Sequence, residues 1–145
     1  MIVRDFRQSD ISDLYRIASL SLDEEYAPEI FDYFRLQWPA GQLVVCLPDG
    51  RVVGFISSSK MDMSTAKIML FAMDHNYRGS GAGTRLLDAL KMKARMEGIR
   101  TMILEVRPTN MRAVSFYRHR GFVPAGVLER FYNDGGPAIR MICNF

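Results

Sequence analysis

Residues 73–84, with the sequence MDHNYRGSGAGT, hold three glycines in alternation at positions 79, 81 and 83. A β-rich run, residues 67–73, precedes this segment, and an amphipathic helical pattern from about 81 to 97 follows it. Glycine lets the backbone approach a ligand closely, and the first turn of a helix supplies unpaired N–H groups at the positive end of the helix dipole. The segment therefore predicts a cradle for a phosphate group, with a glycine-rich turn that binds nothing as the alternative.

Two better-known phosphate motifs fit this segment poorly. A Walker P-loop places Lys and then Ser or Thr directly after its last glycine, whereas Thr84-Arg85 follows here. A dinucleotide site could use Glu105 on the next strand as its ribose-binding acid, but its glycines stand at the end of the preceding strand. In this chain residues 74–78 intervene, and the third glycine comes one place early. The remaining pattern is Arg-x-x-Gly-x-Gly, from Arg78 to Gly83.

The glycine segment joins two predicted strands through a helix. That helix, at 81–97, would bury an apolar stripe and end near Gly98, and residues 100–107 return as a strand. The stripe consists of Leu86, Leu87, Leu90 and Ala94. Because a helical crossover joins them, strands 67–73 and 100–107 should be parallel.

Shorter elements flank this unit on both sides. Ser9 or Asp10 would cap a helix with an apolar stripe, and Asp49-Gly50 predicts a hairpin turn. The stripe consists of Ile11, Leu14, Tyr15 and Ala18. The other expected elements are strands at 2–6, 42–47, 52–58, 122–128 and 137–144, a helix at 28–37, and a short helix that Asn110 caps and Gly121 closes. The predicted class is mixed α+β, one twisted, mostly antiparallel sheet with about four helices, in a single domain over residues 1–145.

Composition is that of an ordinary globular protein. The apolar fraction is 48%, the net charge +3 and the pI about 9.0. No apolar run approaches the roughly 20 residues that span a bilayer, and the charged N-terminus lacks a signal peptide, which predicts a cytoplasmic protein. The basic residues suit solvated helix faces or attraction of a polyanion, either nucleic acid or a phosphorylated cofactor. No metal is expected, because neither disulfide nor metal-ligand spacing relates Cys46, Cys143, His75 and His119.

A second segment, taken with the glycine turn, resembles a known family. Arg78, Gly81 and Gly83 match the pyrophosphate loop of the GNAT superfamily of N-acetyltransferases. The run LEVRPTN at 104–110, with the Ala, Tyr, Gly and Phe at 113, 117, 121 and 122, is similar to the family pattern LEVRxxNxxAxxxYxxxGF. The resemblance covers nearly the whole chain. It implies the GNAT fold, in which the central parallel strands splay apart to admit acetyl-coenzyme A (acetyl-CoA) as co-substrate.

Two groups within this family are similar to the chain in more detail. The run LEVR followed by Asn and Tyr resembles the RimI-like ribosomal-protein alanine acetyltransferases. The run LDEEY at 22–26, followed by LQWP at 36–39, resembles the Ard-type catalytic subunit of the NatA complex. Archaeal enzymes combine features of both groups, so the resemblance implies acetylation of protein N-termini, including ribosomal proteins or nascent chains. Three positions depart from these relatives: Asp23 replaces a proline, Phe131 one tyrosine of a pair, and Pro137 an acidic residue.

The resemblance also implies a set of cofactor-binding residues. The glycine loop would hold the diphosphate, and Asn110 would bond the pantetheine arm. A backbone N–H near Ala72–Met73, where the family strand bulges, would polarise the thioester carbonyl. The full set is Ala72, Met73, Arg78, Gly79, Ser80, Gly81, Ala82, Gly83, Thr84, Asn110 and Tyr117.

Direct transfer of an acetyl group to an amine also needs a base and an acid. Glu105 is the first candidate for the base, acting through a water, and a structural salt bridge is the alternative role. Glu24 is the second candidate and would also orient the peptide. Tyr117 is the expected general acid, because a phenol of pKa about 10 can protonate a thiolate. Aromatic walls would select small first residues at the peptide entrance, and these are Tyr26, Phe131 and Tyr132.

Two rival functions remain open. The same fold with acetyl-CoA could acetylate a lysine side chain or a small amine, although the aromatic loops favour a peptide. A non-enzymatic RNA- or nucleotide-binding module would explain the high pI but not the ordered segments around Arg78 and Glu105. Nucleic acid is therefore not expected as a substrate, nor a membrane as a partner.

Overall fold

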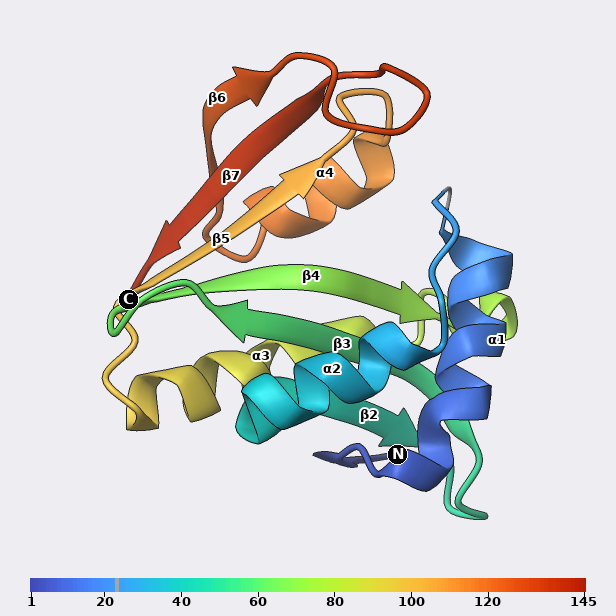
Figure 1. The fold of residues 1–145 in the computed structure, drawn as a ribbon. Helices are drawn as coiled ribbons and strands as arrows, with labels where there is room; N and C mark the ends of the chain where they lie inside the picture. The colour runs from blue at the N-terminus through green and yellow to red at the C-terminus, as the bar shows by residue number, and fades with distance from the viewer. Residues whose placement is uncertain (23) are drawn as a thin grey trace.

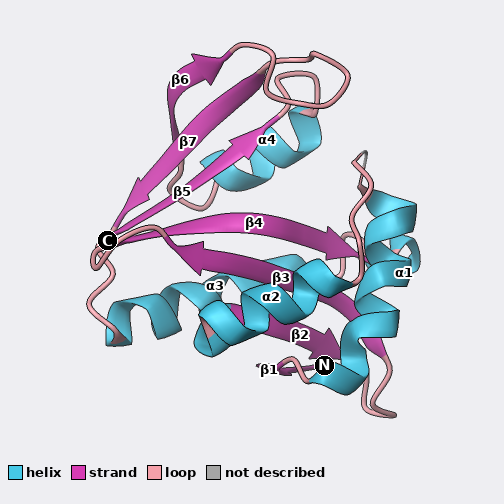
Figure 2. Ribbon diagram, viewed as in Figure 1, coloured by secondary structure: helices cyan, strands magenta, loops and turns pink. Residues whose placement is uncertain are grey.

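A computed structural model describes residues 1–22 and 24–145. Within these ranges seven β-strands form one sheet, and four α-helices surround it (Figures 1 and 2). The strands are β1 (Ile2–Asp5), β2 (Gln42–Cys46), β3 (Val52–Lys60), β4 (Thr65–Met73), β5 (Thr101–Val106), β6 (Val123–Leu128) and β7 (Ala138–Asn144). The helices are α1 (Ile11–Ser21), α2 (Glu29–Gln37), α3 (Ala82–Met96) and α4 (Met111–Arg118), with short 3₁₀ turns at Gln8–Asp10, Pro39–Gly41 and His75–Tyr77.

The order of strands in the sheet is β1-β2-β3-β4-β5-β7-β6. Neighbouring strands are antiparallel except β4 and β5, which are parallel, as the crossover through α3 predicts. The β4–β5 ladder covers only the pairs from Thr65–Thr101 to Lys67–Ile103. Beyond it the two strands diverge, and Figure 1 shows the sheet opening between them. The predicted fold, a mostly antiparallel sheet with a splayed parallel pair, is confirmed.

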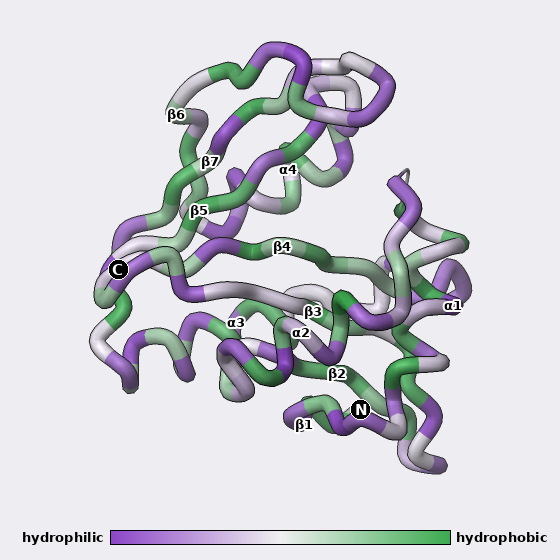
Figure 3. Tube along the Cα trace, in the orientation of Figure 1, coloured by the Kyte–Doolittle hydropathy of each residue, from purple (hydrophilic) through white to green (hydrophobic). Residues whose placement is uncertain are grey.

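The helices divide between the two faces of the sheet and build two hydrophobic clusters. One cluster packs the α3 stripe against the sheet, and the members of this stripe are the predicted Leu86, Leu87, Leu90 and Ala94. The other joins α1 and α2 to the sheet, where Phe31 meets Phe55 edge-on at 5.5 Å. Hydrophobic stretches along β2 and β4 contribute to both clusters (Figure 3). Because apolar side chains are buried on both of its faces, the sheet is a stable support for the site.

A β-bulge exchanges the two faces of β4 in the middle of the strand. Consecutive residues of β3 pair with Leu70 and then with Ile68, so Met69 is the extra residue. Residues two apart on a regular strand share a face, yet Ile68 belongs to the α3 cluster and Leu70 to the α1–α2 cluster. The bulge thereby turns Phe71 towards α4. The resemblance predicts the bulge at Ala72–Met73, and that position is wrong because the extra residue is Met69.

The predicted apolar stripe of α1 is wrong at one position. Tyr15 is 43% exposed, whereas Ile17 is buried with Leu14 and Ala18. Both residues fit a helical period, and only the direction in which α1 lies on the sheet decides between them.

The residue before α1 has a different role from the predicted cap. Asp10 occupies the N-cap position, but its carboxylate accepts hydrogen bonds from the Arg7 N–H at 2.8 Å and from Arg4 at 2.8 and 3.0 Å. Burial alone would raise the pKa of Asp10, yet these hydrogen bonds outweigh it and leave the pKa below its usual value. Asp10 therefore ties α1 to β1 instead of capping the helix.

Candidate active site

Two cavities lie where β4 and β5 separate. The larger, of about 660 Å³, extends along the glycine turn before α3. The smaller, of about 340 Å³, lies between the segment that joins α1 to α2 and the loop that joins β6 to β7. Residues that line both cavities are Ser21, Leu22, Phe71, Asn110, Ala113 and Tyr117. Ligands in the two cavities can therefore meet beside this shared wall.

The glycine turn presents backbone to the larger cavity. Gly79 and Gly81 have positive φ angles of 78° and 85°, which residues with a Cβ rarely adopt, and α3 begins directly after Gly81. Within the described ranges, no protein group accepts a hydrogen bond from the N–H groups of Gly79, Gly81 or Gly83. Free N–H groups at the positive end of the α3 dipole suit an anion.

Most of the residues predicted to hold a cofactor line the larger cavity. They are Ala72, Met73, Arg78, Gly79, Gly81, Gly83, Thr84, Asn110 and Tyr117. The other two shape the turn: the Ser80 hydroxyl donates to the Tyr77 carbonyl at 2.6 Å, and Ala82 is buried. Asn110 also caps α4, as predicted, because its Oδ1 accepts from the Ala113 N–H at 3.2 Å.

Sequence reasoning missed several residues of the larger cavity. These are Tyr77, Arg112, Ser115, Phe116 and Arg120. Arg120 donates to the Thr84 hydroxyl from Nε at 3.1 Å and from Nη2 at 2.5 Å, and its guanidinium lies 4.3 Å from the centre of the Phe116 ring. The basic run at 118–120 was the available signal, but the packing of α4 decides which of its members reaches the cavity.

Tyr117 lies at the junction of the two cavities. Its ring packs against those of Phe71, Phe116 and Phe122, and 9% of the residue is exposed. Burial raises the pKa of Tyr117, with a smaller contribution from the nearby Tyr132 phenol. The hydroxyl therefore keeps its proton and can donate a hydrogen bond to an acceptor at the junction.

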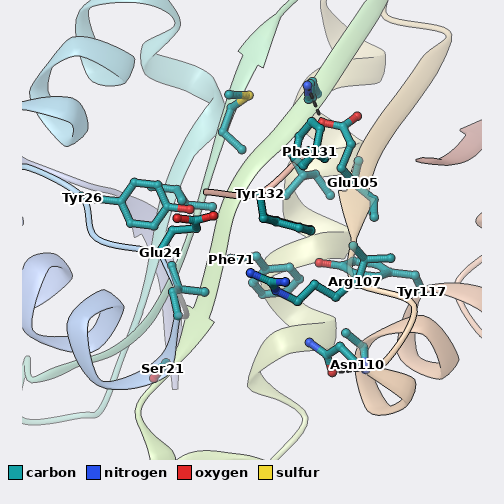
Figure 4. A pocket seen from close by; sticks show the side chains of 18 of the residues that line it. Ser21, Glu24, Tyr26, Phe71, Glu105, Arg107, Asn110, Tyr117, Phe131 and Tyr132 are labelled. Carbon is teal, nitrogen blue, oxygen red and sulfur yellow. Dashed lines mark hydrogen bonds and ion pairs between the residues drawn. The ribbon is translucent and has the colours of Figure 1, made fainter. Parts of the chain in front are cut away.

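Glu105 lines the smaller cavity as the centre of an ion-pair cluster. It projects from β5 between Lys67 of β4 and Arg140 of β7, and its side chain is 4% exposed. One carboxylate oxygen contacts the Lys67 ammonium, and the other accepts from Arg140 Nε at 3.0 Å. Figure 4 shows the Glu105 carboxylate beside Phe131 at the cavity. The salt bridge predicted as the alternative role of Glu105 is present, and it lines the predicted site.

The mouth of the smaller cavity has walls from distant parts of the chain. Glu24 and Tyr26 stand on one side, with Phe131 and Tyr132 across from them (Figure 4). The rings of Phe131 and Tyr132 meet edge-on at 5.0 Å. The structure therefore brings the four predicted peptide-binding residues together, while Asp23 lies outside the described residues.

Tyr132 packs against a cationic side chain that is itself paired with an acidic one. The Arg107 guanidinium lies 4.0 Å from the centre of its ring, and the same guanidinium pairs with Asp134 at 3.1 Å. Burial raises the pKa of Tyr132 to about 12, although the charge of Arg107 opposes this shift. Tyr132 thus presents a protonated hydroxyl, which can donate to a peptide carbonyl.

Apolar residues that were not predicted as site residues complete the smaller cavity. They are Ile30, Phe34, Ile68, Met69, Leu70, Leu104 and Val106. Ile30 and Phe34 come from α2, and Leu70 comes from the part of β4 that follows the bulge. Their contribution depends on tertiary packing, which the helical and strand periods alone do not reveal.

Neither a cluster of metal ligands nor a membrane-spanning helix occurs in the described residues. No group of three or more His, Cys, Asp or Glu side chains in residues 1–22 and 24–145 is arranged to hold a metal ion. Over the same part of the chain, no helix combines the length and apolar character needed to cross a membrane.

Comparison with known proteins gives matches over nearly the whole chain. The sequence model of the acetyltransferase (GNAT) family matches residues 11–122. An N-alpha-acetyltransferase of Sulfurisphaera tokodaii is 33% identical over an alignment of 152 positions, gaps included, which covers 96% of this chain and 90% of that protein. N-alpha-acetyltransferase 30 of Schizosaccharomyces pombe is 29% identical over 135 residues, which cover 91% of this chain and 90% of that protein. The crystal structure of Ard1 from Thermoplasma volcanium superposes with a TM-score of 0.95 at 36% identity, covering 99% of this chain and 96% of that one.

Proposed function

The chain belongs to the acetyltransferase (GNAT) family, and on this basis we propose that it acetylates the α-amino group of protein or peptide N-termini with acetyl-CoA. The amine nitrogen attacks the thioester carbonyl in a ternary complex and forms the amide as the carbon–sulfur bond breaks. The amine loses a proton and the departing thiolate gains one. The observation that carries this proposal is the meeting of the two cavities at Tyr117, because a cofactor and a peptide then share one reaction point.

The larger cavity fits the cofactor. The N–H groups of Gly79, Gly81 and Gly83 would hold the diphosphate, and Arg78 lies beside them. Beyond Lys67 the edge of β4 that faces β5 has no ladder partner within the described ranges, so it can pair with the amides of the pantetheine arm. Asn110 lines this path. Acetyl-CoA supplies the activated acyl group, and the protein supplies its position.

Tyr117 would act as the general acid for the departing thiolate. A raised phenol pKa makes proton transfer harder, but a thiolate released beside Tyr117 enters the same desolvated surroundings. Desolvation raises the proton affinity of the sulfur as well, so the donor and the acceptor stay matched. The hydroxyl also stabilises the developing charge by hydrogen bonding before the proton moves.

Glu105 would take the proton of the incoming amine through a water. Lys67 and Arg140 each engage one oxygen of the carboxylate, so a water must use the lone pairs that remain. Glu24, the second candidate, lies at the mouth of the cavity. Glu24 is not among the residues that line both cavities, so we assign it to peptide binding.

The proposed acceptors are the N-termini of ribosomal proteins or nascent chains, in the cytoplasm, and residues 1–145 would act as one domain. Tyr26, Phe131 and Tyr132 would line the path of the peptide, with a preference for small first residues. These finer assignments follow from the resemblance of LEVRPTN and LDEEY to RimI-like and Ard-type enzymes. For these acceptors the reacting group is the α-amino group of the first residue, and no side chain of the acceptor takes part in the reaction.

The test uses acetyl-CoA and two peptides of equal length. One peptide has a free N-terminus and no lysine, and the other has a blocked N-terminus and one internal lysine. Mass spectrometry should show a gain of one acetyl group on the first peptide alone. Acetylation of only the blocked peptide would assign the protein to lysine acetylation, and calorimetry without acetyl-CoA binding would refute both activities.

A further inference from the structure

Asn133 makes a paired contact with Glu24 that no proposed step has used. We propose that Asn133 is a positioning residue for the peptide site, which holds the Glu24 carboxylate at the mouth; this inference rests on the proposed function. The Asn133 backbone N–H donates to Glu24 Oε1 at 2.9 Å, and its side-chain Nδ2 donates to Oε2 at 2.5 Å. One residue thus holds both oxygens of the carboxylate, across 109 positions of sequence.

This contact, the Glu24–Asn133 bridge, crosses the mouth of the smaller cavity. Glu24 belongs to the segment between α1 and α2, and Asn133 to the loop between β6 and β7. These two segments form opposite walls of the mouth (Figure 4). A single hydrogen bond between exposed groups adds little, but two from one residue fix the direction of the carboxylate as well as its position.

The β6–β7 loop keeps Asn133 in place. The Tyr132 N–H donates to the Gly136 carbonyl at 3.1 Å, and the Gly136 N–H donates to Asp134 Oδ1 at 2.9 Å. Asp134 in turn pairs with Arg107, which follows the last residue of β5. These contacts hold the loop against the end of β5, and they fix the position from which Asn133 donates to Glu24.

The position of the bridge favours a role for Glu24 in peptide binding over a role in the chemical step. Because the Glu24 carboxylate lines the smaller cavity only and is absent from the wall shared with the cofactor cavity, it is placed to attract the cationic N-terminus of an entering peptide and not to remove its proton at the reaction point. Loss of its position should then weaken peptide binding and leave the chemical step unchanged. In kinetic terms the effect belongs in the KM for the peptide and not in kcat.

Asn133→Asp tests this role. The substitution replaces the Nδ2 donor by a carboxylate that repels Glu24, while the backbone N–H remains. We expect the peptide KM to rise about tenfold or more, with kcat and the KM for acetyl-CoA within about twofold of the wild type. The melting temperature of each variant is measured alongside, so that a folding defect is recognised.

A double substitution reverses the polarity of the bridge. In Glu24→Gln with Asn133→Asp, the glutamine amide can donate to the new carboxylate, and the mouth keeps one negative charge. The peptide KM should return to within about threefold of the wild type. Asn144→Asp is the matched control: it adds the same charge at an exposed position, keeps the acceptor for the Thr101 hydroxyl, and should change neither KM.

Two results would overturn the proposal. One is a peptide KM for Asn133→Asp equal to that of the wild type. The other is a raised KM that the double substitution fails to lower, because the new charge would then act on the peptide directly. If the wild type acetylates no free N-terminus, the proposed function fails and the inference with it, whereas an active wild type with an insensitive Asn133→Asp variant refutes the inference alone.

Discussion

Tyr117 lies against Phe71, Phe116 and Phe122 at the meeting point of the two cavities. Three rings exclude water from one side of the phenol, and this desolvation is the main cause of its raised pKa. The side chain cannot swing away, because α4 and the β4 bulge fix the two rings that flank it. A hydroxyl in this position serves chemistry better than packing, since a phenylalanine would fill the same space.

Tyr117→Phe should therefore separate the two roles. We expect kcat to fall about 100-fold, because a general acid contributes typically 10²–10⁴-fold, while the Kd for acetyl-CoA stays within about twofold. Steady-state kinetics and calorimetry measure the two quantities. The exposed Tyr33 provides a matched control, and Tyr33→Phe should behave as the wild type. Equal kcat for Tyr117→Phe and the wild type would leave Tyr117 with packing alone.

Glu105→Gln should affect both turnover and stability. The amide leaves Lys67 and Arg140 without their shared anion, and we expect a loss of about 1–3 kcal/mol in the free energy of unfolding. If Glu105 is also the base, kcat measured well below the melting temperature falls at least about tenfold. Urea unfolding and steady-state kinetics give the two numbers. A destabilised variant with unchanged kcat would assign Glu105 to the ion-pair cluster only.

Individual site residues were predictable where a sequence motif identified both the residue and the helix or strand beside it. The glycine turn, Asn110 and Tyr117 are such cases, because each follows a strand or begins a helix that the sequence indicates. Arg140 was not predictable, since it reaches Glu105 only through the register of β5 with β7. Asn133 was missed for the same reason: its partner lies on a segment whose approach no local pattern describes.

At the scale of elements, the contact of Asp10 with Arg4 joins the start of α1 to β1 and makes stability depend on pH. The pKa of Asp10 is lowered in the folded protein, so folding favours the carboxylate over the acid. The stability that the Asp10 carboxylate contributes is fully present above its pKa in the unfolded chain, about 4. This contribution is lost as the pH falls through its lower pKa in the folded protein. Asp10→Asn should cost about 1–3 kcal/mol at pH 7.

The comparison is made by thermal unfolding from pH 7 to pH 2.5. The difference between wild type and Asp10→Asn should shrink below about pH 4, where the wild-type carboxylate becomes protonated as well. The exposed Asp49 supplies a control in its hairpin turn, and Asp49→Asn should show a smaller difference at pH 7. A difference that is constant over the whole pH range would contradict the charge-based account.

Apolar periodicity predicted the β4–α3–β5 unit but not the bulge within β4. The sequence pattern indicated β4, α3 and β5 and their parallel crossover, because apolar periods and glycine stops coincide there. The bulge was placed wrongly because Ile68, Met69 and Leu70 are all apolar, so the run carries no alternation that would reveal the extra residue. Only the register with β3 identifies Met69.

At the scale of the whole molecule, one sheet is divided into two parts by the short β4–β5 ladder. The crossover predicts that these strands are parallel, and the family resemblance predicts that they separate. The cavities themselves depend on side chains from α1, α2, α4 and the β6–β7 loop, and those contacts lie beyond sequence patterns. A ligand that bridges the two parts should therefore stabilise the folded chain as a unit.

Acetyl-CoA at about 100 times its Kd should stabilise the protein by about 2.7 kcal/mol and raise the melting temperature by roughly 5–10 °C. Gly81→Ala tests the source of this gain, because Gly81 has a φ of 85° and open space around the position of a Cβ. Gly98 is the matched control: it lies just beyond the other end of α3, with a φ of 82° and equally open surroundings. Each substitution should cost about 1 kcal/mol of backbone strain in the ligand-free protein. Only Gly81→Ala should also reduce the shift caused by acetyl-CoA, because its strain changes the direction of the N–H groups that face the cofactor, and equal shifts in both variants would place the diphosphate elsewhere.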